Sequence, residues 1–387
     1  MFNSKSELTL NYKVLHLDHT TALGGAELAL ARLCKMSNGW EPTIALPGKN
    51  DQDLGPFESL EPIVVRVGEP QLSGASRSGI NSIVGFIIRI LEQVWHLRRE
   101  HSFKNADIIH TNTSRSGLYG ALSVLLSRKR LVVHLRDMVT RESLGTMGSL
   151  LFKSIVLPRA NGVIANSEAT LATATKYIRS SASIAVIPSP AGIRSDPKPT
   201  TIRDSVDKIG MVARIDPWKG QELLIEAFAR SFGGSATRLV LAGAPAFGHE
   251  EYLSAITQKA EVLGIASQID FLGHVNDVNS IIDDLDICVQ ASIRPEPLGQ
   301  NVLQYLAAGK PVISADQGGP TEWIIHGENG LLFKAGDVES LASNLKAMRS
   351  KSVREKLASG TTRVKPVPTD EMVARMHADL FSEVIKK

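Results

Sequence analysis

Short apolar runs recur along this chain, and segments of helical length separate most of them. The first series is KVLHLD from residue 13, TIALP from 43, IVVRV from 63, DIIHTN from 107, LVVHLRD from 131, GVIANS from 162 and IAVIPS from 184. Each run is rich in aliphatic residues and has the length of a buried strand. Strands that alternate with helices form a parallel sheet covered by helices. This part of the chain therefore predicts an α/β domain.

The alternation stops at PSPAGIRSDPKPTTIRDS, residues 188–205, and then starts again. The second series is KIGMVARI from 208, RLVLAG from 238, IDFLG from 269, ICVQAS from 287, PVISA from 311 and GLLF from 330. A chain of 387 residues also exceeds one typical domain of roughly 100 to 200 residues. We therefore predict two doubly wound, Rossmann-like domains, residues 1–190 and 191–369, that face each other across a cleft. The helix expected over 370–387, after the proline-rich KPVPT, packs on the first domain.

Composition excludes several classes of protein. A net charge of +3 without a basic arm argues against a nucleic-acid partner. Cys34 and Cys288 lie in apolar runs, as buried thiols in a reducing compartment do. The polar N-terminus lacks a signal-peptide core, and the most apolar run, IVGFIIRILEQVW, contains Arg89 and Glu92, so we expect no membrane span. The predicted location is the cytoplasm, either in solution or peripheral on the cytoplasmic membrane face.

Ligands of such sheets bind where the strands end. The fingerprint of dinucleotide sites requires Gly-x-Gly after the first strand, and no two glycines in the chain have that spacing. GAPAFGHE from residue 243 has the glycine interval of a P-loop, but it places His249 where a lysine must reach the phosphates. A nicotinamide dehydrogenase and a P-loop nucleotidase are both disfavoured.

Two turns that follow strands have the residues of a phosphate site. In VARIDPWKGQ, Arg214 and Lys219 flank a turn, and two cations beside a cleft suit a diphosphate. A solvated turn explains them equally well. In LGGAELALARL, Gly24 and Gly25 precede a helix whose first amides are able to bind an anion. A simple glycine turn is the alternative there.

Glu296 stands in PEPLG, between the strand ICVQAS and the helix NVLQYLAA. The amides of Leu298, Gly299, Gln300 and Asn301 form another N-terminus that attracts anions. A carboxylate would repel a phosphate, so Glu296 is better explained as an acceptor for neutral hydroxyls beside it. A ligand with hydroxyls on both sides of a diphosphate is a nucleotide sugar. The alternative is a loop glutamate that faces solvent.

The motifs in order are GGAE, VARIDPWKGQELLIEAF, LAG, IDFLGHV and SIRPEPLGQNVLQYLAAGKPVISADQGGPTEWIIHGENGLLF. Together they resemble the retaining glycosyltransferases of the GT-B fold, numbered family four and also described as glycosyl transferases group 1. The resemblance is strong over the whole second domain and weak over the first. It implies a nucleotide diphosphate sugar, a UDP or GDP sugar, as donor substrate and no separate cofactor.

The resemblance also implies roles for residues of the second domain. Arg214 and Lys219 match the pair that holds the donor diphosphate, and Glu296 matches the glutamate that contacts the transferred sugar. The family has a second glutamate where this chain has Gln304, which departs from the pattern. Because Gln accepts one hydrogen bond and donates another, we expect ribose binding to survive with altered affinity or nucleotide preference.

Further matches are less specific. His274 and Val275 correspond to the loop beside the nucleotide base. Gly318, Gly319 and Glu322 match a glycine-rich turn, for which packing of the fold is the favoured explanation of Glu322.

Stabilising the charge on the leaving diphosphate is the main catalytic task, and Arg214, Lys219 and helix amides do this without a metal. The Asp-x-Asp strings DQD from 51 and DLD from 284 are expected to be ordinary surface carboxylates. The sequence supports no pair of catalytic carboxylates like the one that a retaining glycosidase uses. The resemblance implies instead a reaction on one face of the sugar, in which the leaving phosphate helps to deprotonate the acceptor.

A histidine after a first-domain strand often assists in this family. In VVHLRDM, Arg136 occupies that place and His134 comes two residues earlier, so both lie on one face of a strand. Our prediction is divided between them. His110, His16 and His19 are weaker candidates, and a structural histidine is the alternative for each.

Acceptor choice is expected to lie in the first domain. FIIRILEQVWHLRREHSFK combines apolar residues, Trp95 and several cations, which suits an anionic membrane surface or a packed helix with a solvated basic end. The family then implies a saccharide or lipid-linked saccharide acceptor in polysaccharide or lipopolysaccharide synthesis. Alternatives are a sugar-nucleotide epimerase or sugar-phosphate synthase of the same fold, and a noncatalytic nucleotide-sugar-binding protein. Arg214, Lys219 and Glu296 favour an enzyme over the last.

Overall fold

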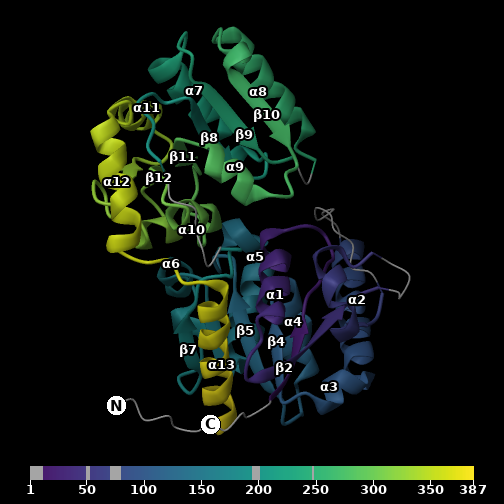
Figure 1. Cartoon of the computed structure of the whole chain (residues 1–387). Coiled ribbons are helices and arrows are strands. Elements are labelled where there is room, and N and C mark those ends of the chain that lie inside the picture. The colour runs from purple at the N-terminus through teal and green to yellow at the C-terminus, as the bar shows by residue number, and fades with distance from the viewer. Residues whose placement is uncertain (1–11, 49–52, 70–79, 194–200, 246–247) are drawn as a thin grey trace, which may run out of the picture. The chain divides into compact units, whose positions relative to one another are not determined.

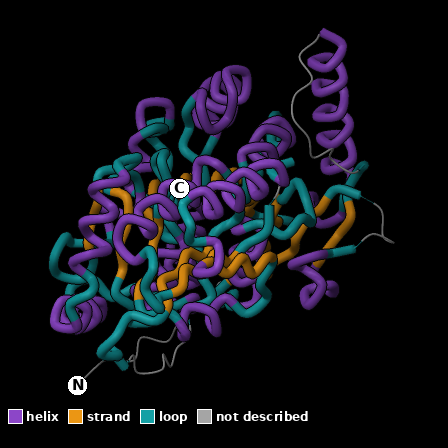
Figure 2. The backbone as a smooth tube through the Cα atoms, turned by 90° about the horizontal axis from the view of Figure 1, so that it is seen from above, coloured by secondary structure: helices purple, strands orange, loops and turns teal. Residues whose placement is uncertain are grey.

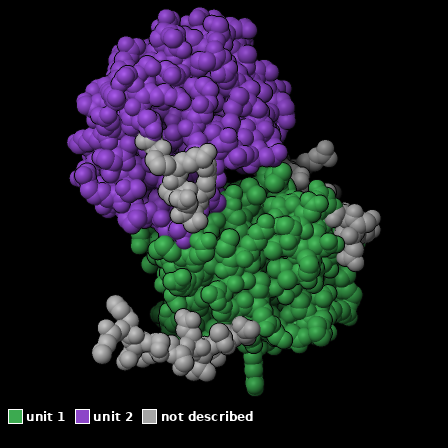
Figure 3. Space-filling model, viewed as in Figure 1, with its two compact units in different colours: residues 1–190, 370–387 green, residues 191–369 purple. Residues whose placement is uncertain are grey.

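The computed structural model describes residues 12–48, 53–69, 80–193, 201–245 and 248–387. The chain divides into two compact units (Figure 3). Unit 1 comprises Met1–Pro190 and Asp370–Lys387, and unit 2 comprises Ala191–Thr369. Each unit has its own parallel sheet with helices packed around it (Figures 1 and 2). The predicted α/β class with two doubly wound sheets is confirmed.

Unit 1 contains a seven-stranded sheet in the order β3-β2-β1-β4-β5-β6-β7, and every pair in it is parallel. Its strands are β1 (Tyr12–Leu17), β2 (Trp40–Leu46), β3 (Val64–Arg66), β4 (Ile108–Thr111), β5 (Arg130–Leu135), β6 (Gly162–Ala165) and β7 (Ser183–Val186). Its α-helices are α1 (Gly25–Lys35), α2 (Ile80–Arg99), α3 (His101–Asn105), α4 (Ser114–Ser123), α5 (Arg141–Leu151), α6 (Glu168–Ala172) and α13 (Asp370–Lys386). Each apolar run of the first series forms a strand.

Unit 2 contains a six-stranded parallel sheet in the order β10-β9-β8-β11-β12-β13. Its strands are β8 (Lys208–Val212), β9 (Arg238–Ala242), β10 (Ile269–Gly273), β11 (Ile287–Gln290), β12 (Val312–Ala315) and β13 (Leu331–Phe333). Its α-helices are α7 (Gln221–Phe232), α8 (Glu250–Val262), α9 (Val278–Asp284), α10 (Gln300–Ala307), α11 (Val338–Ala347) and α12 (Lys351–Arg363). Each apolar run of the second series forms a strand here too.

The cores of the two units explain why the apolar runs are continuous rather than alternating. The central strands of each sheet are buried on both faces; β4, β6, β11 and β12 are buried at every position. Cys34 and Cys288 are buried free thiols, as predicted. Burial raises the pKa of Cys288 to about 12, so this thiol is unreactive at neutral pH. Among the described residues, no helix is both long and apolar enough to cross a bilayer.

Helix α13 belongs to unit 1, although unit 2 precedes it in the sequence. It lies along β5, β6 and β7 (Figure 1). Two hydrogen bonds fix its C-terminal part: Tyr12 Oη donates to Ser382 Oγ at 3.2 Å, and Ser183 Oγ donates to Glu383 Oε1 at 2.8 Å. The last residues of the chain therefore complete the core of the first unit.

A layer of four buried histidines lies between the sheet of unit 1 and α13. His16, His110 and His134 come from the neighbouring strands β1, β4 and β5, and His377 comes from α13. The His16 and His110 Nδ1 atoms are 2.9 Å apart, and the His377 ring centroid is 5.6 Å from that of His134. Among the described residues, neither ring nitrogen of His134 has a hydrogen-bond partner. This histidine layer is thus packed like an aromatic core.

Burial holds the histidine layer neutral. Desolvation lowers the pKa of His16 to about 3 and that of His377 to about 4, and the charge of Arg136 acts in the same direction. Desolvation also lowers the pKa values of His110 and His134 well below 6.5. These histidines therefore stay unprotonated in the folded unit at pH values at which the unfolded chain binds protons there.

The histidine layer predicts a loss of stability in acid. Because the folded pKa values are depressed, the stabilisation is present above the unfolded pKa of about 6.5 and falls as the pH approaches 4 and then 3. In this window, each histidine that stays neutral in the folded state lowers the free energy of unfolding by up to ~1.4 kcal/mol for every unit by which the pH falls. We expect His377→Leu to flatten the fall of Tm between pH 6.5 and 4.5, measured by circular dichroism.

The matched control is His96→Leu, a change at an exposed histidine of α2. Its Tm should fall with pH as steeply as that of the wild type. Parallel curves for wild type and His377→Leu would show that the layer does not govern acid stability.

Candidate functional site

The first turn of the candidate site follows β8 and carries two cations. Arg214 comes two residues after the strand, and Lys219 ends the short 3-10 helix Pro217–Lys219. Asp216 caps this turn by accepting a hydrogen bond from Trp218 N at 3.4 Å, and its Oδ2 lies 3.2 Å from Arg214 Nη2. The Arg214 and Lys219 side chains are 37% and 19% exposed, so both remain within reach of a ligand.

Glu296 lies beside Lys219, although 77 positions separate them in the sequence. Its Oε1 accepts hydrogen bonds from Lys219 Nζ at 2.5 Å and from Ser292 Oγ at 2.6 Å. Gln290 Nε2, at the end of β11, is 3.5 Å from the same oxygen. The pairing follows from the sheet order, because β8 and β11 are neighbours and their carboxyl ends meet. Glu296 is buried rather than a loop glutamate in solvent.

Helix α10 begins directly after this cluster. Its N-cap, Gly299, has φ of 72°, a left-handed conformation that favours glycine. Asn301 Nδ2 donates to the Val212 carbonyl at 3.2 Å and ties the first turn to β8. Leu298 is buried in the core beneath. The amides of the first turn, including that of Gln300, belong to the set that has no intrahelical acceptor.

Gln304 takes part in a contact that a glutamate cannot make. Its Nε2 donates to the carbonyl of Ala191 at 2.8 Å, which is the first residue of unit 2. An ionised carboxylate has no hydrogen to donate and would face this carbonyl. The departure from the family pattern therefore has a local structural role.

The remaining predicted residues of unit 2 lie on two further loops of its sheet. His274 is exposed and Val275 half-buried, on the loop after β10, and β10 is the edge strand two places beyond β8. Gly318 has φ of 72°, and a Cβ there would lie 2.3 Å from the Glu296 carbonyl oxygen. Gly319 N donates to the same oxygen at 2.8 Å. The glycine turn thus supports the backbone of Glu296.

Glu322 ends the short 3-10 helix Gly319–Glu322 that follows this turn. Its backbone carbonyl accepts a hydrogen bond from Lys365 Nζ at 2.7 Å. This contact joins two segments of unit 2 and agrees with a packing role.

One expectation about carboxylates is wrong. Asp286 of the DLD string is buried, not on the surface, because its Oδ2 accepts hydrogen bonds from the amides of Asp207 and Lys208 at 2.8 and 2.9 Å. It fixes the start of β8. Asp284 is half exposed and pairs with the Lys208 side chain. The DQD string begins at Asp51, which lies outside the described residues.

Unit 1 has a polar network at the carboxyl ends of β1, β4 and β5. Asn112 Nδ2 donates to Asp18 Oδ2 at 2.6 Å, and Arg136 Nε donates to Asn112 Oδ1 at 2.8 Å. Arg136 Nη1 also donates to Ser189 Oγ at 2.6 Å. His19 N donates to Asp18 Oδ1 at 2.6 Å. We call Asp18, His19, Asn112 and Arg136 the edge network.

The two candidates for the assisting residue occupy different environments. Arg136 belongs to the edge network, whereas His134 lies one layer deeper among the buried histidines, together with His110 and His16. Burial lowers the pKa of Arg136 to about 10, which keeps its guanidinium charged at neutral pH. His19, a weaker candidate from the sequence, lies in the edge network with its side chain 24% exposed.

Glu27 is a residue that the sequence reasoning did not select. Gly24 is the N-cap of α1 and Gly25 its first residue, and a Cβ on Gly24 would lie 2.2 Å from Glu27 Oε2. The Glu27 carboxyl therefore folds back over the glycines predicted to bind an anion. Desolvation, with the nearby Asp18 adding to it, raises the pKa of Glu27 to about 7, so this carboxyl is partly neutral at physiological pH.

Asp18, His19 and Glu27 each place one potential ligand atom within 4.8 Å of the other two, which is close enough for a shared metal ion. The charged Arg136 beside them already supplies a positive charge. The sequence contains a signal for these residues, because Asp18 and His19 directly follow a strand and Glu27 lies in the first turn of the next helix. Side chains two positions apart along a strand lie on the same face, which relates His16 to Asp18, His110 to Asn112 and His134 to Arg136.

Comparison with known proteins identifies both units. Residues 193–362 match the family model described as glycosyl transferases group 1, and residues 23–191 match the model described as glycosyltransferase family 4. HepE from Anabaena, crystallised with UDP and glucose, has a TM-score of 0.77 with 24% identity, covering 96% of this chain and 100% of its own. At that identity the likeness concerns the fold.

Two relatives match over part of their length. EpsD of Bacillus subtilis is 38% identical over 134 residues, which are 34% of this chain and 34% of EpsD. The lipopolysaccharide core biosynthesis glycosyltransferase LpsE of Rhizobium meliloti is 33% identical over 141 residues, 36% of this chain and 39% of LpsE. The matched parts thus span little more than a third of these relatives. With a family model matched in each unit, the chain belongs to the group 1 glycosyltransferases of the GT-B fold.

Proposed function

We propose that this protein is a retaining glycosyltransferase that moves a sugar from a nucleotide diphosphate sugar to a saccharide or lipid-linked saccharide. The observation that carries the proposal is the ion pair of Lys219 and Glu296, 2.5 Å apart, with Arg214 on the same turn as the lysine. Cations suit the diphosphate, and a buried carboxylate beside them suits sugar hydroxyls. A nucleotide sugar combines both features.

The proposed donor is a UDP or GDP sugar. Arg214 and Lys219 hold the diphosphate, and the first amides of α10, from Leu298 to Asn301, extend the same anion site. Gln304 meets the ribose, while His274 and Val275 lie towards the base. HepE supports UDP, because that structural neighbour was crystallised with UDP and glucose and also with UDP-glucose. Gly24 and Gly25 of unit 1 are proposed as a separate anion site, beside the Glu27 carboxyl, whose pKa is raised by desolvation to about 7 and which therefore repels an anion less.

The proposed reaction breaks the bond between the sugar and the diphosphate, and negative charge builds up on the leaving phosphate. Lys219 and Arg214 stabilise that charge as fixed donors, so transfer is proposed to need no metal. Glu296 keeps Lys219 in place and accepts a hydroxyl of the sugar. Arg136 supplies a fixed positive charge on the acceptor side.

Retention is checked by the anomeric coupling constant of the product in proton NMR; an inverted anomer would contradict it.

The acceptor is proposed to belong to envelope polysaccharide or lipopolysaccharide synthesis. The relative LpsE carries a lipopolysaccharide name, and this supports a lipid-linked saccharide as acceptor. An enzyme that uses such an acceptor works at a membrane surface. We therefore propose a cytoplasmic protein that is peripheral on the membrane.

Helix α2 offers the surface for that contact. Ile87, Leu91 and Trp95 recur every four residues and are 50%, 56% and 52% exposed, so they form one apolar stripe. The Arg99 guanidinium lies 3.4 Å from the Trp95 ring centroid, and Arg98 follows on the same turn. Apolar side chains flanked by arginines suit an anionic lipid surface.

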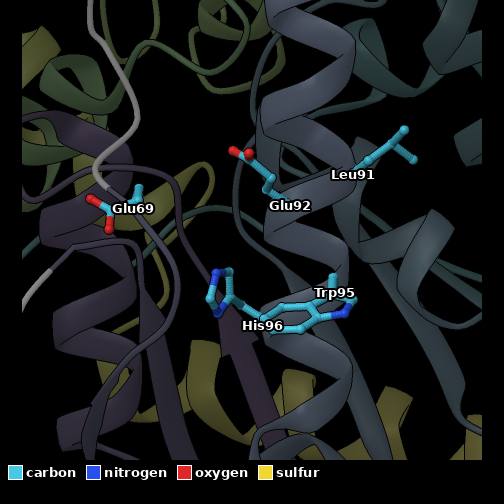
Figure 4. A pocket seen from close by; sticks show the side chains of 5 residues that line it. All are labelled: Glu69, Leu91, Glu92, Trp95 and His96. Carbon is cyan, nitrogen blue, oxygen red and sulfur yellow. The ribbon is translucent and has the colours of Figure 1, made fainter.

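A pocket of about 520 Å³ opens beside this stripe. Figure 4 shows that Leu91, Glu92, Trp95 and His96 line it from α2 and that Glu69 faces them. The carboxylates give the pocket a polar side next to the apolar stripe. A polar pocket next to an apolar stripe suits a lipid whose head group carries hydroxyls.

The donor site predicts selective binding of one nucleoside diphosphate. We expect UDP or GDP, without metal, to raise the Tm of the wild type, whereas ADP and CDP do not. Lys219→Ala should lose most of that shift, because a charge-assisted hydrogen bond contributes about 1.5 to 3 kcal/mol. Differential scanning fluorimetry with each nucleotide, with and without magnesium, measures this.

Lys346→Ala in α11 is the matched control, because that lysine is exposed and far along the chain from the site. It should shift like the wild type. The absence of a shift with every nucleotide would overturn the glycosyltransferase proposal as stated. A shift without release of nucleoside diphosphate from any donor would favour the noncatalytic binding protein, and an epimerised sugar nucleotide would favour the epimerase.

The α2 stripe predicts binding to anionic vesicles. Replacing Ile87, Leu91 and Trp95 together by serine should lower the fraction that sediments with phosphatidylglycerol vesicles by more than tenfold. The reason is that each apolar side chain contributes about 1.5 to 3 kcal/mol when it leaves water. Val262→Ser, at an apolar residue of α8 that is 79% exposed, is the control. Equal sedimentation of the triple variant and the wild type would rule out α2 as the contact.

A further inference from the structure

The turn between α4 and β5 contains a leucine in a strained backbone conformation. Leu126 comes two positions after Val124, the C-cap of α4, and has φ of 59°. Among the residues that the structure describes, it is the one residue other than glycine with a positive φ. This left-handed conformation is unfavourable for a residue with a Cβ, and glycine or asparagine is usual after a helix. The stability of the turn therefore does not explain the leucine.

The core does not explain it either. The Leu126 side chain is fully exposed, and that of Leu125 beside it is 37% exposed. Turns are usually formed by small and polar residues. Backbone strain that the fold itself does not need is typical of functional segments. We call Leu125 and Leu126 the leucine tip.

Cations surround the leucine tip. Arg128 is exposed just after it, and Lys129 Nζ donates to the carbonyls of Lys104 and Ala106 at 2.5 and 2.6 Å, which holds the turn beside the end of α3. Helix α3 follows α2 directly, and α4 packs on α2 (Figure 1). The basic end of α2 therefore belongs to the same edge of unit 1. The cations of this edge are Arg98, Arg99, Lys104, Arg128, Lys129 and Arg130.

The carboxylates in the same segments are Glu100 and Asp107, and each binds a backbone amide. Glu100 Oε1 accepts a hydrogen bond from His101 N at 3.1 Å, and Asp107 Oδ2 accepts one from Lys13 N at 2.9 Å. The six cations outnumber these two carboxylates. The edge that carries the leucine tip is therefore positively charged and attracts anions.

We propose that the leucine tip inserts into the head-group region of an anionic bilayer while the cations around it contact lipid phosphates. The inference rests on the proposed membrane location and adds a contact on a different element from the α2 stripe. Insertion removes the leucines from water, and the cations add electrostatic attraction. Two adjacent leucines form a much smaller patch than a stable protein interface, which buries about 800 Å² on each partner. A nucleic acid offers phosphates but no apolar layer for the leucines.

The first experiment places an NBD fluorophore, which reports the polarity around it, on Leu126→Cys. Cys34 and Cys288 are buried, and burial raises the pKa of both thiols, so the label reacts at the new cysteine. We expect NBD emission to shift to shorter wavelength with phosphatidylglycerol vesicles and to stay unchanged with phosphatidylcholine vesicles. Val262→Cys on α8, labelled in the same way at an exposed position, is the control and should not shift.

The outcomes separate the leucine tip from the membrane location itself. An unchanged NBD spectrum on vesicles that sediment with the protein overturns the proposal and leaves the α2 contact in place. A protein that sediments with no anionic vesicle overturns the membrane location as well. Neither result bears on the transferase proposal, because nucleotide binding is measured without lipid.

The second experiment uses Leu126→Gly, which removes the apolar side chain and also relieves the left-handed strain. We expect the partition coefficient into phosphatidylglycerol vesicles to fall by about tenfold or more, because the leucine no longer leaves water. The Tm without lipid should stay the same or rise. Leu126→Phe should bind vesicles like the wild type. An unchanged partition coefficient for Leu126→Gly overturns the proposal, and a lowered Tm with unchanged partition assigns the leucine to the fold.

The cations around the tip are tested by charge reversal. Arg128→Glu should weaken sedimentation with phosphatidylglycerol vesicles, and added salt should weaken that of the wild type, because both reduce the attraction to lipid phosphates. Lys346→Glu on α11 is the matched control and should sediment like the wild type. Vesicle binding that depends on neither Arg128 nor salt would contradict the role of the cations.

Discussion

In a parallel sheet that helices cover on both faces, polar side chains reach a ligand at the edge where the strands end. Both units obey this constraint. In unit 2 it brings Lys219, after β8, next to Glu296, after β11, because these strands are neighbours in the sheet. In unit 1 it gathers Asp18, Asn112 and Arg136 from three adjacent strands. Every candidate catalytic group therefore owes its position to strand order, and the order depends on the burial of the apolar runs.

The histidine layer of unit 1 is an exception to that constraint, and its energetics explain how it is tolerated. Three strands place an imidazole two residues before the polar residue that ends them, so the histidines lie one layer below the edge network. Buried polar groups cost free energy unless they are bonded or neutral. Desolvation by burial lowers the pKa of His16 and His377, and the positive charge of Arg136 adds to this effect, so the rings stay uncharged. The edge network and the layer beneath it thus form one electrostatic unit.

The periodicity of the sequence was sufficient to predict the strands, and the motifs assigned Lys219 and Glu296 to one ligand, although their ion pair was not predicted. Other features depended on side-chain geometry that a sequence does not contain. Asp286 was expected on the surface because it lies at a helix-to-strand junction, yet it accepts hydrogen bonds from two backbone amides and is buried. His134 lies on β5 and Arg136 follows directly after this strand, and the depth of the histidine layer separates their environments.

The charges of the proposed donor site are balanced before any ligand binds. Lys219 pairs with Glu296, and Arg214 pairs with Asp216, so these four groups sum to zero. Two unpaired cations would bind a diphosphate more tightly, but they would also hold the leaving nucleotide after transfer. A transition state benefits from cations only to the extent that they act on it more strongly than on the bound substrate and product. In the proposed reaction Lys219 stays paired with Glu296 and acts on the developing phosphate charge from that fixed position. We therefore propose that the pairing favours turnover over tight binding, which accounts for a carboxylate beside the proposed phosphate site.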